Sequence, residues 1–366
     1  MLEEKPNDVV YLFGAGATHA CVNAVGSAYG ILMGDLTEEI LDRVRTTITT
    51  EPKFETLETL FNSVIDENTD FEHIITFLDQ STSAHHRQFA ESLRDIFESV
   101  LKARLEKIRN EQGGLPTHLY EALLEFHGLD CCPERLKGIL TLNYDNYLET
   151  AARKLNRTVN FGISIENNHL GKNPLEVIKL HGSFTWGDDW PVNLLDTGSH
   201  VWIPPGIQKA KDRYPYNLLW GKARELLDCD VVRIIGCRLG SNDWDLISLL
   251  FTTQHTNANR TPFEVEVIDS PQLAEAVKKS FPYLSVKSIL ECAYVGSRLI
   301  EEFSSHNSDN GASLEDDPIE EILKHIKPRQ NWFRVWLQQL AEYMYTEHED
   351  VGSDDGAFKK ILEAHG

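Results

Sequence analysis

Several features that define large classes of proteins are missing from this sequence of 366 residues. No apolar run approaches the roughly 20 residues that a helix needs to cross a bilayer, so we do not expect a membrane protein. Residues 1–6 are acidic and lack the apolar stretch of a secretory signal. We therefore expect a cytoplasmic protein.

Cationic side chains are also scarce. The 35 lysines and arginines stand against 57 aspartates and glutamates, which gives a formal net charge of −22. No broad basic surface is available to hold phosphates, and we predict no direct binding of nucleic acid. An acidic excess of this kind is typical of a solvated exterior.

The cysteines are few and scattered, and none forms a Cys-x-x-Cys motif; they are Cys21, Cys131, Cys132, Cys229, Cys237 and Cys292. Disulfide stapling is not expected in so large a domain, and this spacing does not assemble a zinc ribbon. The adjacent His85 and His86 fit a surface position better than a metal site. We predict reduced thiols and no bound metal.

Short apolar runs rich in β-branched residues alternate with helical patterns along much of the chain. The predicted strands are 9–13, 138–142, 177–180, 231–235 and 263–268. The helices predicted beside them are 15–24, 147–155, 218–227 and 244–252. This alternation predicts an α/β protein with a Rossmann-like, doubly wound parallel sheet.

One long stretch breaks the alternation. Residues 36–125 are almost entirely helical in pattern, which predicts a large helical insertion within a catalytic domain of residues 1–300. Residues 304–318 are polar and acidic and indicate a linker. Residues 319–366 should form C-terminal helices. Their apolar stripe, which includes Trp336, either docks on the main domain or makes an oligomer contact.

A glycine-rich turn, Gly14-Ala15-Gly16-Ala17-Thr18, follows the first predicted strand. Glycine lets a backbone approach a pyrophosphate, and a helix N-terminus supplies N–H donors and a favourable dipole. His19 stands where a dehydrogenase has its third glycine, and no acidic residue ends a second strand at the required spacing. We expect a dinucleotide bound in a non-dehydrogenase geometry; the alternative is a tight turn that binds nothing.

Two polar motifs, Thr141-Leu142-Asn143-Tyr144-Asp145 and Leu180-His181-Gly182, follow the next two predicted strands. Polar residues just past the carboxyl ends of strands face the ligand crevice of an open α/β sheet. Asn143, Asp145 and His181 are therefore expected around one small substrate. Each has a structural alternative: a turn-capping asparagine, an aspartate capping the following helix, and a core histidine bonded to a backbone carbonyl.

Taken together, these motifs resemble the sirtuin-like superfamily, particularly its bacterial antiphage branch that consumes NAD. The similar elements are Gly14-Ala15-Gly16-Ala17-Thr18, Pro116-Thr117-His118, Thr141-Leu142-Asn143-Tyr144-Asp145, Leu180-His181-Gly182, Pro204-Pro205 with Trp220, and Ile235-Gly236-Cys237-Arg238-Leu239 before Asp243. Two departures stand out. The interval from Gly182 to Val231 holds only Cys229, so the four-cysteine zinc module of deacylases is missing, and their Asp-Phe-Arg run is reduced to Asp35.

The resemblance implies an NAD+ glycohydrolase, with NAD as its substrate and no zinc. Asn143 would orient the ribose and water, because an amide is both donor and acceptor. His181 would be the general base, since the pKa of histidine lies near neutral, and Asp145 would contact the nicotinamide carboxamide. The remaining NAD contacts are assigned to Gly14, Ala15, Gly16, Ala17, Thr18 (through its hydroxyl), Asp35, Gly236, Leu239, Ser241 and Asp269.

The resemblance also implies an antiphage effector that depletes NAD+, as a homo-oligomer and, in some systems, with a HerA-type ATPase ring. A second hypothesis is a non-catalytic subunit that senses NAD or ADP-ribose. The presence of both Asn143 and His181 argues against it, because a pure binder needs no base. A deacylase is a third hypothesis, which the missing cysteines disfavour.

Overall fold

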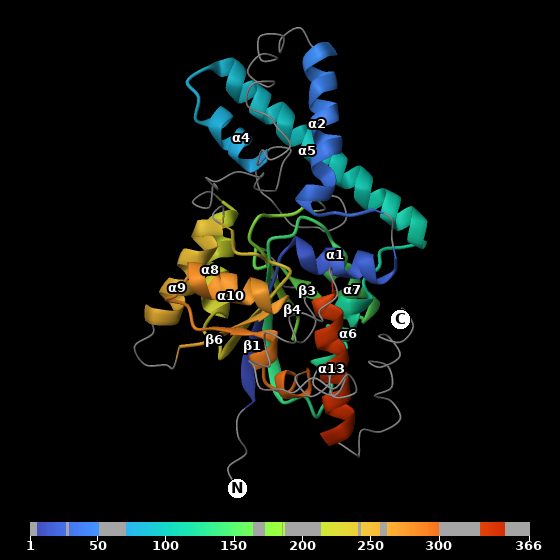
Figure 1. The fold of residues 1–366 in the computed structure, drawn as a ribbon, viewed down its shortest axis with the longest axis vertical. Coiled ribbons are helices and arrows are strands. Elements are labelled where there is room, and N and C mark those ends of the chain that lie inside the picture. Colours follow the sequence, from blue (N-terminus) through green and yellow to red (C-terminus); the bar gives the residue numbers. More distant parts are fainter. Residues whose placement is uncertain are drawn as a thin grey trace, which may run out of the picture.

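One parallel β-sheet organises the chain, in a computed structural model that describes residues 6–26, 29–50, 71–163, 173–184, 186, 214–240, 243–256, 262–299 and 330–347. The sheet has seven strands in the order β3-β4-β2-β1-β5-β6-β7, and neighbouring strands are parallel throughout. The strands are β1 (Asn7–Phe13), β2 (Glu134–Thr141), β3 (Val159–Asn160), β4 (Leu175–Lys179), β5 (Val231–Ile235), β6 (Glu264–Ile268) and β7 (Val286–Ser288). The predicted Rossmann-like α/β fold is confirmed (Figure 1).

The described helices cover both faces of the sheet or stand beyond its carboxyl edge. They are α1 (Ala15–Ala24), α2 (Met33–Thr50), α4 (Phe71–Asp79), α5 (Ala84–Gln112), α6 (His118–Phe126), α7 (Tyr147–Lys154), α8 (Tyr216–Leu226), α9 (Trp244–Thr256), α10 (Pro271–Ser280), the 3-10 turn η4 (Ile289–Glu291) and α13 (Trp332–Glu347). Local signals set several ends: the Ser270 side chain caps α10 by accepting from Leu273 N, and α5 stops at the left-handed Gly113.

Alternate residues of β1 enter two different cores, as expected of a strand covered on both faces. Val9, Tyr11 and Phe13 belong to the α1 core, which also contains buried residues of α1, α6, α7 and α13. Val10 and Leu12 belong to the α8 core, with residues of α8, α9 and α10. The continuous apolar run in the sequence reflects this two-sided burial.

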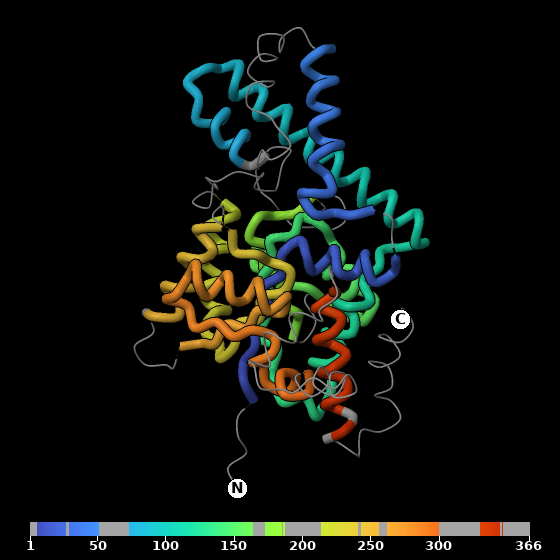
Figure 2. The backbone as a smooth tube through the Cα atoms, in the orientation of Figure 1, coloured from blue at the N-terminus to red at the C-terminus, as the bar shows by residue number. Residues whose placement is uncertain are grey.

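Helices α2, α4 and α5 form a helical arm with a core of its own, here called the arm core. In Figures 1 and 2 the arm lies at the top, whereas β1 begins near the amino terminus at the bottom. The arm therefore stands beyond the carboxyl ends of the strands. Helix α6, the last of the helices predicted within residues 36–125, packs instead in the α1 core.

The C-terminal helix α13 packs its apolar stripe in the α1 core, where Trp336 and Leu337 are almost completely buried. The linker predicted at 304–318 lies outside the described residues, as do residues 319–329 and 348–366 of the predicted C-terminal helical segment. The division of the chain near residue 300 stays a prediction. Within the described ranges, no helix is both long and apolar enough to span a membrane.

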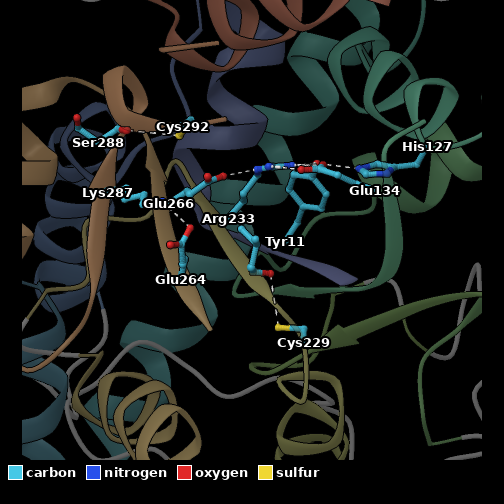
Figure 3. Close-up of polar contacts among 11 residues, drawn as sticks. Tyr11, His127, Glu134, Cys229, Arg233, Glu264, Glu266, Lys287, Ser288 and Cys292 are labelled. Atoms are coloured by element: carbon cyan, nitrogen blue, oxygen red, sulfur yellow. Dashed lines mark hydrogen bonds and ion pairs between the residues drawn. The ribbon is translucent and has the colours of Figure 1, made fainter. Parts of the chain in front are cut away.

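A charged cluster crosses the middle of the sheet inside the α1 core (Figure 3). Arg233 of β5 is 1% exposed and donates to Glu134 of β2 and to Glu266 of β6, each at 2.6 Å. Its guanidinium also lies 5.2 Å from the Trp336 ring. Burial alone would raise the pKa of Glu134, but the Arg233 charge lowers it below its ordinary value. The cluster joins the central strands to α13.

Candidate active site

The glycine turn and both polar motifs meet at the carboxyl edge of the sheet. Thr141 of β2 pairs with Phe13 of β1 on one side and with Lys179 of β4 on the other. Backbone hydrogen bonds continue this register past the strand ends, from Leu142 N to Phe13 O at 2.9 Å and from Leu180 N to Thr141 O at 3.0 Å. The predicted site residues therefore follow adjacent strands, at the place where an open α/β sheet binds its ligand.

Asn143 is fixed directly against the glycine turn. Its side chain is buried, and Nδ2 donates to Gly14 O at 3.0 Å and to Thr18 Oγ1 at 3.1 Å. Its backbone N donates to Thr141 Oγ1 at 3.1 Å. Both amide hydrogens are thus used within the protein, and the group that Asn143 can offer to a ligand is its Oδ1 acceptor.

Thr18 has hydrogen-bond partners within the protein. Its side chain is completely buried, and its hydroxyl lies 3.0 Å from the Tyr120 hydroxyl of α6 in addition to accepting from Asn143. The side chain faces into the protein, where it supports the Asn143 amide, and the contact of its hydroxyl with a pyrophosphate stays a prediction. A sequence motif shows the residue type but not the partner, and Tyr120 comes from a distant helix.

The glycines of the turn are required by another backbone turn, the one that follows β5. Gly16 N donates to Gly236 O at 2.9 Å, and a Cβ on Gly14 would meet that same oxygen at 2.5 Å. Gly236 itself has φ +64, and a Cβ there would lie 2.1 Å from Ala17 N. Two turns cross at a distance that no side chain permits. Packing alone explains these glycines, with or without a ligand.

His181 follows β4 and is 6% exposed. Its imidazole lies beside the ring of Tyr144, with centroids 6.1 Å apart and planes inclined at 30°. The carbonyl of Tyr144 accepts from Phe184 N at 3.1 Å and from Ser183 Oγ at 2.8 Å. The residue after Asn143 is thereby bonded to the residues after His181, so the two motifs form one connected structure.

Asp145 fills the capping role that was its alternative. Its Oδ1 accepts from Tyr147 N at 3.1 Å, at the start of α7. Burial raises the pKa of Asp145, while the Lys179 charge and hydrogen bonds from Tyr147 N and the Thr18 side chain act in the opposite direction. A carboxyl with a raised pKa near a ligand crevice is a functional candidate as well as a cap.

Comparison with known proteins bears on the part of the chain that holds these residues. Residues 137–278 match the family model described as SIR2-like domain. The match supports a sirtuin-like family. A SIR2-like domain implies NAD-dependent activity in general, and Asn143, Asp145 and His181 all lie within the matched segment. The glycine turn after β1 precedes it.

A solved structure of a mutant of Sir2 homologues in complex with 2′-O-acetyl ADP ribose shares 15% identity, with 85% of this chain and 96% of that chain covered and a TM-score of 0.35. No curated protein shows significant similarity to the sequence.

A buried ion pair, which the sequence motifs do not indicate, stabilises the segment that matches the SIR2-like model. Lys179, the last residue of β4, lies 2.6 Å from Glu149 of α7, and each side chain is 1% exposed. Lys179 Nζ also donates to the backbone carbonyl of Asp145. Burial raises the pKa of Glu149, and the Lys179 charge opposes that shift. The pair fixes the end of β4 to the loop that carries Asn143.

The other predicted contacts lie on separate elements: Asp35 in the first turn of α2, and Leu239 and Asp269 in the loops after β5 and β6. Asp35 Oδ2 accepts from Leu32 N at 3.0 Å and lies 3.8 Å from His19 Nδ1. Leu239 is buried in a left-handed conformation, with φ 49. Asp269 accepts from Ser270 N at 2.6 Å, and burial raises the pKa of its carboxyl. Ser241 lies outside the described residues.

The described residues form no cluster of metal ligands. In the described part of the chain, no group of three or more histidine, cysteine, aspartate or glutamate side chains is arranged to hold a metal ion. The absence of zinc stays a prediction from the cysteine spacing.

Proposed function

We propose that this protein is an NAD+ glycohydrolase, which cleaves the nicotinamide–ribose bond to give nicotinamide and ADP-ribose. The observation that carries the proposal is the placement of Asn143 and His181. They follow two adjacent strands, with the Asn143 amide bonded to the glycine turn and the two motifs bonded to each other through Tyr144. The SIR2-like match over residues 137–278 supports NAD as the substrate.

The reaction breaks a C–N bond whose electron pair leaves with the neutral nicotinamide. Positive charge develops on the ribose, as in other glycosidic cleavages, and water forms the new C–O bond while losing a proton. His181 accepts that proton as general base. Asn143 presents Oδ1, its remaining hydrogen-bonding group, to the water or a ribose hydroxyl, and its fixed amide adds no reorganisation cost.

The other parts of NAD are assigned to residues according to where those residues lie in the fold. The pyrophosphate lies at the N-terminus of α1, where the helix dipole favours an anion and the backbone of Gly14–Thr18 is close. Asp145 contacts the nicotinamide carboxamide. In this proposal Asp35, Gly236, Leu239, Ser241 and Asp269 make further contacts with NAD. No zinc ion takes part.

The first test is nicotinamide release from NAD+ by the purified protein. Asn143→Ala and His181→Ala should each lower the rate by at least about 100-fold, in the range typical of losing an acid–base or positioning group. Asn110→Ala and His85→Ala serve as matched controls, because both residues are exposed on α5. Full activity in either site variant, with folding confirmed by circular dichroism, contradicts the mechanism.

The resemblance extends the proposal to a biological role. We propose an antiphage effector in the cytoplasm that depletes NAD+, working as a homo-oligomer and together with a HerA-type ATPase. Unrestrained cleavage of NAD+ would harm the host, so an assembly that controls it is expected. Light scattering of the protein alone, and NAD+ loss with and without the product of the neighbouring gene, test this extension.

One observation favours a second candidate, a non-catalytic subunit that senses NAD or ADP-ribose. The donors of Asn143 and the hydroxyl of Thr18 are already bonded within the protein, as a purely structural turn would require. A time course of NAD+ loss separates the two functions. Tight binding of NAD+ without turnover, alone or with the partner, would identify the sensor.

A further inference from the structure

Tyr144 is one of the residues that join the loops carrying Asn143 and His181. Its carbonyl accepts two hydrogen bonds, from Phe184 N and Ser183 Oγ. Its ring stacks on Phe184 at a centroid distance of 5.0 Å and an interplanar angle of 22°, and it also lies beside His181. Tyr144 therefore joins the two loops through both its backbone and its ring.

The helical arm reaches this same residue. Phe97 of α5 meets the edge of the Tyr144 ring, with centroids 6.3 Å apart at 79°. Lys102, about one turn further along α5, lies 5.6 Å from the centroid of Phe184. Phe184 is itself a member of the arm core, and Tyr144 packs against that core. Residues at the ends of β2 and β4 thus share a hydrophobic core with the arm.

From these contacts we propose that Tyr144 is a positioning residue for His181, and that helix α5 of the arm holds Tyr144 in place. The proposal rests on the glycohydrolase function and deepens it. His181 lies two residues beyond Lys179, the last residue of β4. The strand therefore does not fix the orientation of the imidazole ring. In the proposal, the ring contacts that run from Phe97 through Tyr144 to His181 supply that orientation, and they make the arm part of the support for the base.

The position of the arm gives the inference a consequence for regulation. The arm lies beyond the carboxyl edge of the sheet and carries its own core (Figure 2). A shift of α5 against the sheet would change the contact of Phe97 with Tyr144 and, through it, the orientation of the His181 ring. A partner that binds the arm would therefore act on the proton-accepting step without touching NAD.

The experiment compares two conservative substitutions on α5. Phe97→Leu removes the ring that contacts Tyr144 while keeping an apolar side chain. Phe89→Leu is the matched control, since Phe89 is equally buried in the arm core but lies about 12 Å away along the helix axis. Phe97→Leu should lower kcat at least about fivefold with KM within about twofold, because misplacement of a catalytic group affects chemistry more than binding. Phe89→Leu should change neither by more than about twofold.

Substitutions at Tyr144 supply the conservative rescue. Tyr144→Leu should lower kcat by at least about tenfold. Tyr144→Phe keeps the ring and should restore most of that loss. Equal activity of the Leu and Phe variants would show that the ring does not position His181 and would overturn the proposal.

A readout that does not depend on activity keeps the inference separate from the proposed function. The imidazole resonance of His181, assigned by its absence in His181→Ala, should shift in Phe97→Leu and stay unchanged in Phe89→Leu. If the wild type does not cleave NAD+, the glycohydrolase function falls, while a selective shift in Phe97→Leu still supports the positioning contact. An unchanged His181 resonance in Phe97→Leu overturns the inference, whatever the activity.

Discussion

Neighbouring groups restrict the hydrogen bonds that the Asn143 amide can make with a ligand. In the sequence it is a donor and an acceptor; in the fold both hydrogens are committed, to Gly14 O and Thr18 Oγ1. A buried donor left without a partner costs about 1–3 kcal/mol, so these bonds hold the amide in one orientation. The Oδ1 acceptor is consequently fixed in direction, which is the property that a residue orienting water or ribose needs.

Among the described glycines, Gly236 is the one at which we expect an added methyl group to lower the stability of the fold most. Its φ of +64 disfavours any L side chain, and a Cβ would lie 2.1 Å from Ala17 N. Gly236→Ala should lower the free energy of unfolding by about 2–5 kcal/mol, the sum of left-handed strain and overpacking. Urea unfolding followed by circular dichroism measures this change.

The matched control for Gly236 is Gly221 in α8, where an added Cβ meets nothing within 4 Å. Gly221→Ala should raise stability by up to about 1 kcal/mol, because alanine is the better helix former. Similar losses in both variants would show that the crossing of the two turns is not as tight as described.

At the scale of single residues, the sequence predicts where some site residues lie but not which partners the others have. Asn143 and His181 are predicted from their motifs because residues that follow strands must lie at the carboxyl edge. Thr18 and Asp145 acquire their roles from Tyr120 and from Tyr147 N, partners that a motif does not contain. Lys179 was missed because a lysine that ends a strand usually signals exposure.

At the scale of elements, the pair of Lys179 and Glu149 joins β4 to α7. Each charge is buried, so removing one leaves the other without compensation. Glu149→Gln should therefore lower the free energy of unfolding by about 3–5 kcal/mol. The double variant Lys179→Met/Glu149→Leu should lose less than the sum of its two single variants, because it leaves no buried charge.

A double-mutant cycle in urea tests the pair, with Lys222→Met/Glu225→Leu as the surface comparison. Lys222 and Glu225 lie 2.5 Å apart on α8 but are 46% and 66% exposed. Their coupling should stay within about 1 kcal/mol, as is usual for solvated pairs. Additive losses at Lys179 and Glu149 would contradict a tightly coupled buried pair.

The elements themselves show which signals in a sequence are strong. Strands β1, β4, β5 and β6 were predicted within a few residues, because both faces are covered and their runs are apolar. The start of β2 at Glu134 was missed, since its first residues are charged and their partners, Arg233 and Asp8, are remote. Strands β3 and β7 were missed because two or three residues carry no readable period.

For the whole molecule, the sequence predicts the α/β class and the presence of many helices between residues 36 and 125. It does not predict which of these helices build the arm and which cover the sheet. Helical periodicity is the same for α5, which builds the arm, and for α6, which covers the sheet. Only tertiary contacts separate them. The consequence for function is that the arm meets the candidate site through Phe97 and Tyr144, which no local pattern indicates.

The buried cluster around Arg233 ties several elements into one structure, and it predicts how the whole molecule responds to acid. Tyr11 links the cluster to His127, with its hydroxyl 2.8 Å from His127 Nε2. Burial lowers the pKa of His127 from 6.5 to about 3, although the Glu134 charge opposes that shift. As the pH falls below about 6.5, the unfolded chain therefore takes up a proton at this residue that the folded protein refuses.

Stability contributed by neutral His127 is thus complete above pH 6.5 and is lost progressively as the pH falls toward 3. His127→Gln removes this titration. The free energy of unfolding of the wild type, minus that of the variant, should fall by up to about 1.4 kcal/mol per pH unit in that window. The raised pKa values of Asp145 and Glu149 act with the opposite sign, but both proteins share them and they cancel in the difference. Urea unfolding between pH 7.5 and 4 measures this slope; parallel profiles would mean that the imidazole is protonated in the folded protein and that the cluster is more open to water than its burial indicates.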